Sequence, residues 1–248
     1  MKKHLLVELG YQYLKNGNGL VHFVENEEDN KFLNDLEKYP HAYVLSCCMD
    51  RQITAERAWM IPVKIKNILG DFSIETLSNI TLEQYKEIFN NNNFHRFNDT
   101  MAEVFYSGVQ LIKNKYDGDA SKIWKDNPSS ATVVLRFLDF RGCGIKIATM
   151  ATNILARQFK IQFSDYFSID VSPDIHVKRV MHRVGLITER DDINEIIYKA
   201  REMNPEFPGI IDSPLWEIGR TYCHETKPNC KDCMLNSVCK NYYNKEKK

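Results

Sequence analysis

The chain lacks the two kinds of apolar segment that send a protein into or across a membrane. Its 248 residues contain no run that approaches the roughly 20 consecutive apolar residues needed to span a bilayer. Residues 1–20 interleave Lys2, Lys3, Glu8 and Lys15 with scattered apolar positions, so they have no uninterrupted apolar core of the secretory kind. We therefore expect a cytoplasmic protein without a membrane partner.

The sequence also lacks an excess of charge of either sign, because 33 basic residues balance 33 acidic ones. This balance argues mildly against a nucleic-acid partner, since proteins that bind phosphates usually have a basic excess. A local basic face stays possible if particular residues converge. The candidates for that face are Lys178, Arg179, Arg183, Arg220, Lys240, Lys245, Lys247 and Lys248.

Strict apolar–polar alternation and internal repeats are both absent, which leaves little sign of β-strands. Apolar residues instead recur at intervals of three and four, the spacing of an amphipathic helix. The length and the 43% hydrophobic content allow one large domain or two modest ones. The sequence predicts an all-α protein with helices over residues 2–14, 40–60, 82–90, 98–116, 131–140, 145–158, 174–184, 192–203 and 213–223.

Cysteine is scarce and unevenly placed, with four of the seven residues in the last 26 positions. The clustered four are spaced Cys223-x6-Cys230-x2-Cys233-x5-Cys239, and such a loop can ligate either a cubane iron–sulfur cluster or a tetrahedral zinc ion. A zinc ribbon usually has two Cys-x-x-Cys pairs, whereas this loop has one. The spacing favours the cluster, with a zinc-stabilised binding module as the alternative. Three further cysteines stand in apolar surroundings and are expected not to be ligands: Cys47, Cys48 and Cys143.

The segment 140–148, Phe-Arg-Gly-Cys-Gly-Ile-Lys-Ile-Ala, joins two apolar helical runs and predicts a helix, a tight turn and a helix. Gly142 and Gly144 allow the sharp turn and leave backbone N–H groups accessible at the start of the second helix. Such N–H groups bind phosphate well. An ordinary helical hairpin whose glycines serve only the turn is an equally supported alternative.

Lys146 and Asp174 are the two candidate catalytic residues. Lys146 lies in the first turn of the second helix, where a cation faces the helix dipole with the unfavourable sign. This placement supports a functional role as an amine nucleophile, and the alternative is a solvated surface lysine, the commonest environment of this residue type. Asp174 follows Ser172 and Pro173 at the head of a basic helix, where it would serve as an N-cap and stabilise positive charge in a reaction. His176 is expected to pack or to form hydrogen bonds.

Three separated motifs, in this order, resemble the endonuclease III family of helix-hairpin-helix DNA glycosylases. The hairpin resembles the family's Leu-Pro-Gly-x-Gly-x-Lys-x-Ala pattern, with Lys146 at the catalytic lysine. Asp174 resembles the catalytic aspartate in its Asp-x-His-x-x-Arg-Val context, and the cysteine spacing is that of the family's cluster loop. Gln52, in residues 50–54, looks like the glutamine that fills the gap left by an extruded base. The resemblance covers most of residues 40–240.

The resemblance implies a six-helix domain over residues 30–168, with the hairpin at about 131–158, and a helical iron–sulfur domain built from residues 1–29 and 169–248. It implies a [4Fe–4S] cluster held by Cys223, Cys230, Cys233 and Cys239. DNA would lie between the two domains. The DNA-contacting residues would include Gln52, His95, Arg96, Arg141, Gly142, Gly144 and Lys178.

The implied activity is base-excision repair by a monomeric, nucleoid-associated protein of the prokaryotic type. The enzyme would flip a damaged or mismatched base out of double-stranded DNA, remove it, and nick the strand by β-elimination as an AP lyase. Phe140 and Arg141 depart from the family's Leu-Pro pair, the segment between Lys146 and Asp174 is longer than usual, and residues 91–97 match no subgroup. Oxidised pyrimidines are the family's usual substrates, and oxidised purines stay open. The alternatives are a monofunctional glycosylase for mismatched or alkylated bases and a catalytically silent DNA-binding relative.

Overall fold

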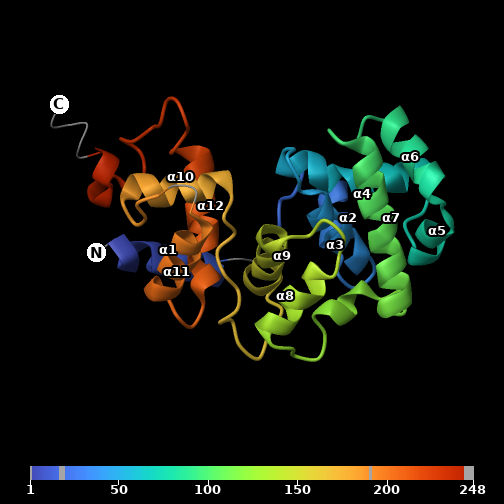
Figure 1. Cartoon of the computed structure of the whole chain (residues 1–248), viewed down its shortest axis with the longest axis horizontal. Coiled ribbons are helices and arrows are strands. Elements are labelled where there is room, and N and C mark those ends of the chain that lie inside the picture. Colours follow the sequence, from blue (N-terminus) through green and yellow to red (C-terminus); the bar gives the residue numbers. More distant parts are fainter. Residues whose placement is uncertain (1, 17–19, 190–191, 243–248) are drawn as a thin grey trace. The chain divides into compact units, whose positions relative to one another are not determined.

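The computed structural model describes residues 2–16, 20–189 and 192–242. Within these ranges every regular element is a helix and no strand occurs, as Figure 1 shows. The all-α class predicted from the apolar spacing is therefore confirmed. Among the same residues, no helix combines the length and the apolar character that crossing a bilayer requires.

The chain divides into two compact units. The first contains residues 1–19, 129–134 and 152–248, and the second contains residues 20–128 and 135–151. Residues 20–29, expected in the cluster domain, belong to the second unit because side chains of α2 hold them there. Asn30 Oδ1 accepts hydrogen bonds from the N–H groups of Phe23 and Val24 at 2.8 and 3.0 Å.

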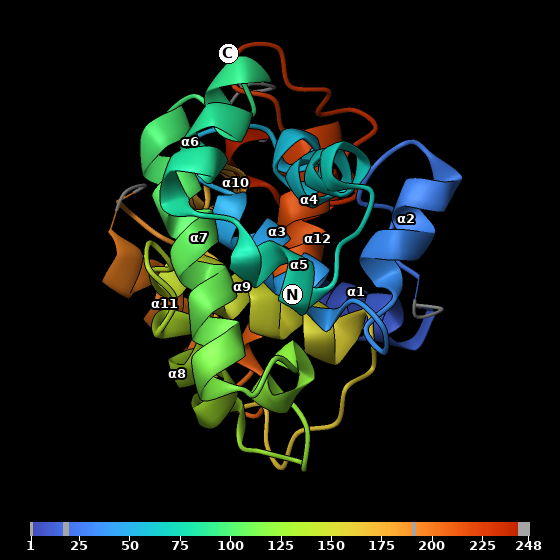
Figure 2. The same ribbon diagram turned by 90° about the vertical axis from the view of Figure 1, so that its right-hand side faces the viewer.

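The second unit is built around one fully buried helix. Its elements are α2 (Glu27–Asn34), α3 (Pro40–Met49), α4 (Ala55–Leu69), α5 (Ile74–Asn79), α6 (Leu82–Asn91), α7 (Asn98–Lys115), η1 (Ala120–Ile123) and parts of α8 (Ser130–Leu138) and α9 (Ile145–Arg157). Every residue of α3 is buried, and α3 packs against α4, α7 and η1. The long helix α7 also packs against α5 and α6, and Figure 2 shows the three together.

The helix predicted over residues 40–60 is two helices, so that prediction is wrong. The helix α3 ends at Met49, and α4 begins at Ala55 with Thr54 as its N-cap. Gln52 between them has a φ of 56°, in the left-handed region that an α-helix cannot contain. The second helix then continues through Pro62 as far as Leu69, because the residues on either side of this proline are buried and anchor the helix.

The first unit contains α1 (Lys2–Asn16), α10 (Ile175–Val184), α11 (Ile193–Met203), η2 (Pro208–Ile211), α12 (Asp212–Thr221) and η3 (Asn236–Val238). The helix α12 lies at its centre and packs against α1, α10 and η2. The helices α10 and α12 approach closely, since a Cβ added at Gly219 would lie 2.6 Å from the Cβ of His176. This close packing fixes the helix that carries Asp174 at its head.

Candidate functional site

The turn between α8 and α9 is packed on one side and open on the other. Gly142 has a φ of 81°, and a Cβ added there would lie 2.9 Å from Arg51 Nη1. Phe140 and Cys143 are buried, and the Cys143 N–H donates to the Phe140 carbonyl at 3.0 Å. A Cβ added at Gly144 would meet nothing within 4 Å. The first N–H groups of α9 have no hydrogen-bond partner within the helix. They therefore lie next to Gly144, where the surrounding space is open.

Lys146, the second residue of α9, forms an ion pair with a residue that the sequence did not single out. Its Nζ lies 3.2 Å from Asp50 Oδ2, and the side chains of Lys146 and Asp50 are 39% and 12% exposed. Asp50 is the C-cap of α3, and its N–H donates to the Cys47 carbonyl at 3.2 Å. The C-terminal end of α3 and the N-terminal end of α9, which are far apart in the sequence, thus lie together at the Lys146 amine. The resemblance singles out Gln52 in residues 50–54, but no spacing in the sequence connects position 50 with position 146.

Arg141 is exposed beside the hairpin and is held against α7. Its Nη2 donates to Glu103 Oε2 at 2.8 Å, while the other carboxylate oxygen of Glu103 lies 3.1 Å from Lys86 Nζ. The hydrogen bond from Lys86, together with the nearby Arg141 charge, lowers the pKa of Glu103. The three residues form a charged cluster in which Lys86 and Glu103 are half-buried and Arg141 is exposed.

Two loop segments lie side by side: residues 50–54, in which Gln52 is expected to fill the gap left by an extruded base, and residues 91–97. Arg57 of α4 connects them, because its Nε donates to the Phe94 carbonyl at 3.0 Å and its Nη2 donates to the Asn93 carbonyl at 2.7 Å. Both segments contribute to one open surface hollow, which includes the exposed side chains of Gln52 and Arg96. Its lining residues are Gln52, Ile53, Thr54, Arg57, Asn93 and Arg96.

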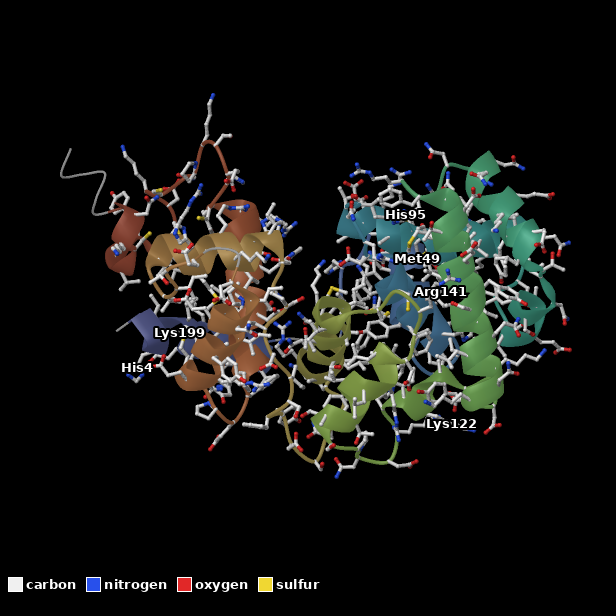
Figure 3. The ribbon with its side chains drawn as sticks, viewed as in Figure 1. His4, Met49, His95, Lys122, Arg141 and Lys199 are labelled. Atoms are coloured by element: carbon white, nitrogen blue, oxygen red, sulfur yellow. The ribbon has the colours of Figure 1, made fainter. Side chains whose placement is uncertain are left out.

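His95 is buried within this second segment. The ring Nδ1 of His95 accepts a hydrogen bond from the Phe97 backbone N–H at 3.1 Å. The backbone N–H of His95 donates to Asn98 Oδ1 at 2.8 Å. Burial lowers the pKa of His95, although the carbonyls of Met49 and Arg51 oppose that effect. Figure 3 labels His95 and Met49 in this part of the unit. His95 therefore anchors the loop and is inaccessible to a ligand in this conformation, so we do not retain it as a DNA contact.

Asp174 lies in the first unit and has the cap geometry that the sequence predicted. Its Oδ1 accepts a hydrogen bond from the Val177 N–H at 2.8 Å, and its side chain is half-buried. The preceding segment is held by buried Asp212, whose Oδ1 accepts from the Ser172 N–H at 2.6 Å. Lys178, on the next turn, is half-buried, and its backbone N–H donates to the Asp174 carbonyl at 3.0 Å.

The remaining residues of the Asp-x-His-x-x-Arg motif are structural. The guanidinium of buried Arg179 contacts His176 Nδ1 at 2.8 Å and donates to the carbonyls of Gly219 at 2.9 Å and Cys223 at 2.5 Å. These contacts tie α10 to α12 and to the start of the cysteine loop. They confirm that His176 packs and forms hydrogen bonds.

All four clustered cysteines line one small cavity of about 20 Å³, the walls of which include Val180, Val184 and Leu235. Arg183 supports the loop, since its Nη1 lies 3.5 Å from Cys223 Sγ and its carbonyl lies 3.5 Å from Cys239 Sγ. Burial, followed by proximity to the other three thiols, raises the pKa of Cys233. Among the described side chains, no three of the metal-binding types are grouped closely enough to hold a single ion.

The other three cysteines belong to the second unit and are buried. Cys143 of the hairpin lies 3.3 Å from Cys48 of α3, measured between the sulfur atoms. The hydrogen bond to Cys143, then burial, raises the pKa of Cys48, and burial raises that of Cys47. These thiols pack the hairpin onto α3.

No family model matches the chain. Over 79 residues, 32% of this chain and 36% of the other protein, the sequence is 29% identical to endonuclease III of Bacillus subtilis (strain 168). The match thus spans about a third of that relative's length.

Solved structures match over almost the whole chain. A trapped covalent intermediate of endonuclease III with DNA superposes with a TM-score of 0.65 at 15% identity, covering 98% of this chain and 96% of that one. A thermostable thymine-DNA glycosylase superposes with a TM-score of 0.64 at 13% identity, covering 98% and 97%. The chain therefore has the fold of the helix-hairpin-helix DNA glycosylases, as the resemblance of its motifs implied.

Proposed function

We propose that this chain, which has the helix-hairpin-helix glycosylase fold, is a DNA glycosylase of the endonuclease III type with AP-lyase activity in base-excision repair. The observation that carries the proposal is the position of Lys146, in the first turn of α9 directly after a glycine turn that is open at Gly144. The local similarity to endonuclease III and the matching fold support the same assignment.

Double-stranded DNA with a damaged or mismatched base is the proposed partner, bound by one copy of the chain. The open start of α9 suits a backbone phosphate, because helix N–H groups and the helix dipole both favour an anion there. Gln52 and Arg96 are exposed at one hollow, which suits the filling of the gap that an extruded base leaves. Arg141, and Lys178 on α10, would contact the DNA backbone.

In the proposed chemistry the Lys146 amine, in its neutral form, attacks C1′ of the flipped nucleotide. The bond between C1′ and the base breaks, and the base leaves with the electron pair and acquires a proton. Loss of the amine proton and opening of the sugar give a Schiff base, after which removal of a C2′ proton expels the 3′ phosphate and nicks the strand. Asp174, held at its helix cap, would stabilise the positive charge that develops on the sugar.

The four clustered cysteines are the proposed ligands of a [4Fe–4S] cluster, which would supply shape to the loop 223–239 and no hydrolytic chemistry. The donor set fits, because all four thiols line one cavity with largely apolar walls. Iron and acid-labile sulfide in anaerobically purified, brown protein would support this assignment, and colourless zinc-loaded protein would refute it.

The test of function is a screen of duplexes that each carry one defined lesion: an oxidised pyrimidine, an oxidised purine, an alkylated base or a mismatch. Base release, strand nicking and borohydride-trapped protein–DNA adduct are measured for each duplex. We expect release, nick and adduct together, with oxidised pyrimidines the preferred class. Release of free base while no duplex in the screen gives an adduct would establish a monofunctional enzyme. Binding of DNA while no duplex in the screen loses its base would establish a catalytically silent protein.

A further inference from the structure

Asp50 is an acidic side chain that is mostly withdrawn from water and aimed at the proposed nucleophile. Only 12% of its side chain is exposed, and its Oδ2 lies 3.2 Å from Lys146 Nζ. A carboxylate so far removed from water needs a charged or hydrogen-bonding partner. Its backbone is fixed as well, because Asp50 caps α3, a helix in which every residue is buried. The carboxylate is therefore a rigid anchor for a long and otherwise adaptable amine.

The position of Lys146 makes such an anchor necessary. The N-terminal end of a helix carries a partial positive charge, which disfavours an ammonium group in the first turn. Asp50 supplies the opposite charge at this place, and it does so from another helix. An opposite charge within hydrogen-bonding distance orients an amine through a charge-assisted hydrogen bond.

We propose that Asp50 is a positioning residue of the reaction: it holds the Lys146 amine at the mouth of the hairpin, in the orientation needed for attack. This inference rests on the proposed function. It adds a residue from α3 to the reaction centre that the hairpin motif alone defines.

Other ionisable groups lie on the elements that carry the pair and on the neighbouring segments. They are Arg51 of the turn, His95 of the second loop segment, Cys47 and Cys48 of α3, Cys143 of the hairpin, and the Arg141–Glu103 ion pair. Burial raises the pKa of Cys47 and lowers that of His95, so both are uncharged near neutral pH. Asp50 is an anion in direct contact with the amine.

The experiment uses the full-length protein and a duplex with a single abasic site, which needs the amine but no base removal. The rate of borohydride-trapped adduct formation is measured under single-turnover conditions at saturating protein, and the affinity for the same duplex is measured in parallel. In Asp50→Asn the adduct rate should fall about tenfold, because the amine is no longer held in place. The affinity for the duplex should be unchanged, because Asp50 orients the amine and is not a proposed DNA contact.

Two further variants make the result specific. Asp50→Glu keeps the charge but moves it by one methylene, so its adduct rate should lie between that of Asp50→Asn and that of the wild type, with unchanged duplex affinity. Asp139→Asn removes a carboxylate near the hairpin that pairs with Lys115 at 2.6 Å, and it should leave both values unchanged.

An adduct rate in Asp50→Asn equal to that of the wild type overturns the inference, as does a loss of duplex affinity as large as the loss of rate. If Asp50→Asn does not fold, a wild-type adduct rate in Asp50→Glu overturns it instead. Failure of the wild-type protein to trap any abasic or lesion-bearing duplex would instead refute the proposed function. The two failures are therefore distinguishable.

Discussion

The two glycines of the hairpin turn should respond to alanine in opposite ways. At Gly142 the backbone φ is 81°, and an added Cβ would lie 2.9 Å from Arg51 Nη1 and 3.3 Å from Val104 Cγ2. At Gly144 an added Cβ would meet nothing within 4 Å, and φ is not in the left-handed region. Gly142→Ala therefore strains the folded protein itself. Gly144→Ala leaves the fold unstrained, and its methyl group can clash only with a ligand that binds at this turn.

The magnitudes follow from these surroundings. A left-handed conformation costs alanine about 1–2 kcal/mol, and the clash with Arg51 adds little because the end of that side chain can move. For a protein of this size the melting temperature should fall by about 2–8 °C in Gly142→Ala. Gly144→Ala should change stability by about 1 kcal/mol or less, in the stabilising direction, because alanine reduces the freedom of the unfolded chain. Its methyl group would hold a phosphate away from the helix N–H groups, and affinity for duplex DNA should fall about tenfold, the equivalent of about 1.4 kcal/mol.

Thermal unfolding followed by circular dichroism and duplex binding followed by fluorescence anisotropy at fixed salt measure the two effects separately. The reasoning fails if Gly142→Ala melts at the wild-type temperature, because the backbone strain would then be absent. It also fails if Gly144→Ala binds undamaged duplex as tightly as the wild type, because no phosphate would then approach that residue.

Three further predictions concern other parts of the molecule. Cys143→Ala should leave the iron content unchanged, whereas Cys233→Ala should lower it; equal iron loss in both variants would contradict the ligand set. Gln52→Ala should reduce lesion processing more than binding to undamaged duplex, and equal reductions would show that Gln52 does not act as a wedge. The pKa values of His41 and His95 are lowered in the folded chain, mainly by burial, so the unfolded chain binds more protons than the folded one at acidic pH. These two histidines therefore contribute to the free energy of unfolding above the pKa of an unfolded histidine. Their contribution is lost as the pH falls through the histidine range, from about 7.5 to about 5.5. Urea unfolding at both pH values measures the loss of unfolding free energy between them. This loss should be smaller in His41→Phe than in the wild type, and an equal loss would contradict the role of His41.

Much of the fold could be predicted from the sequence, because long helices have a strong periodic pattern. The hairpin between α8 and α9, the cap at Asp174 and the structural role of His176 all depend on neighbours within a few residues. Local pattern sufficed for each of them. The convergence of the four cysteines on one cavity likewise involves a single loop of 17 residues, from Cys223 to Cys239.

The features that the sequence did not disclose depend on distant residues. The break between α3 and α4 falls in a run whose helical spacing continues without interruption, and only the cap at Thr54 and the left-handed Gln52 mark it. The short helices α2 and α5 give too little periodicity to be recognised. Asp50 is 96 positions from Lys146, and His95 is buried by residues of another segment. Tertiary packing decides such contacts, and one sequence does not contain that information in local form.

Identification of the amine that forms the covalent intermediate tests the account most directly. The borohydride-reduced adduct with an abasic duplex is digested with nuclease and protease, and mass spectrometry locates the residue that carries the sugar remnant. The account predicts a remnant on Lys146, and predicts that Lys146→Gln yields neither adduct nor nick. A remnant on another lysine or on the N-terminal amine, or full adduct yield from Lys146→Gln, would contradict it.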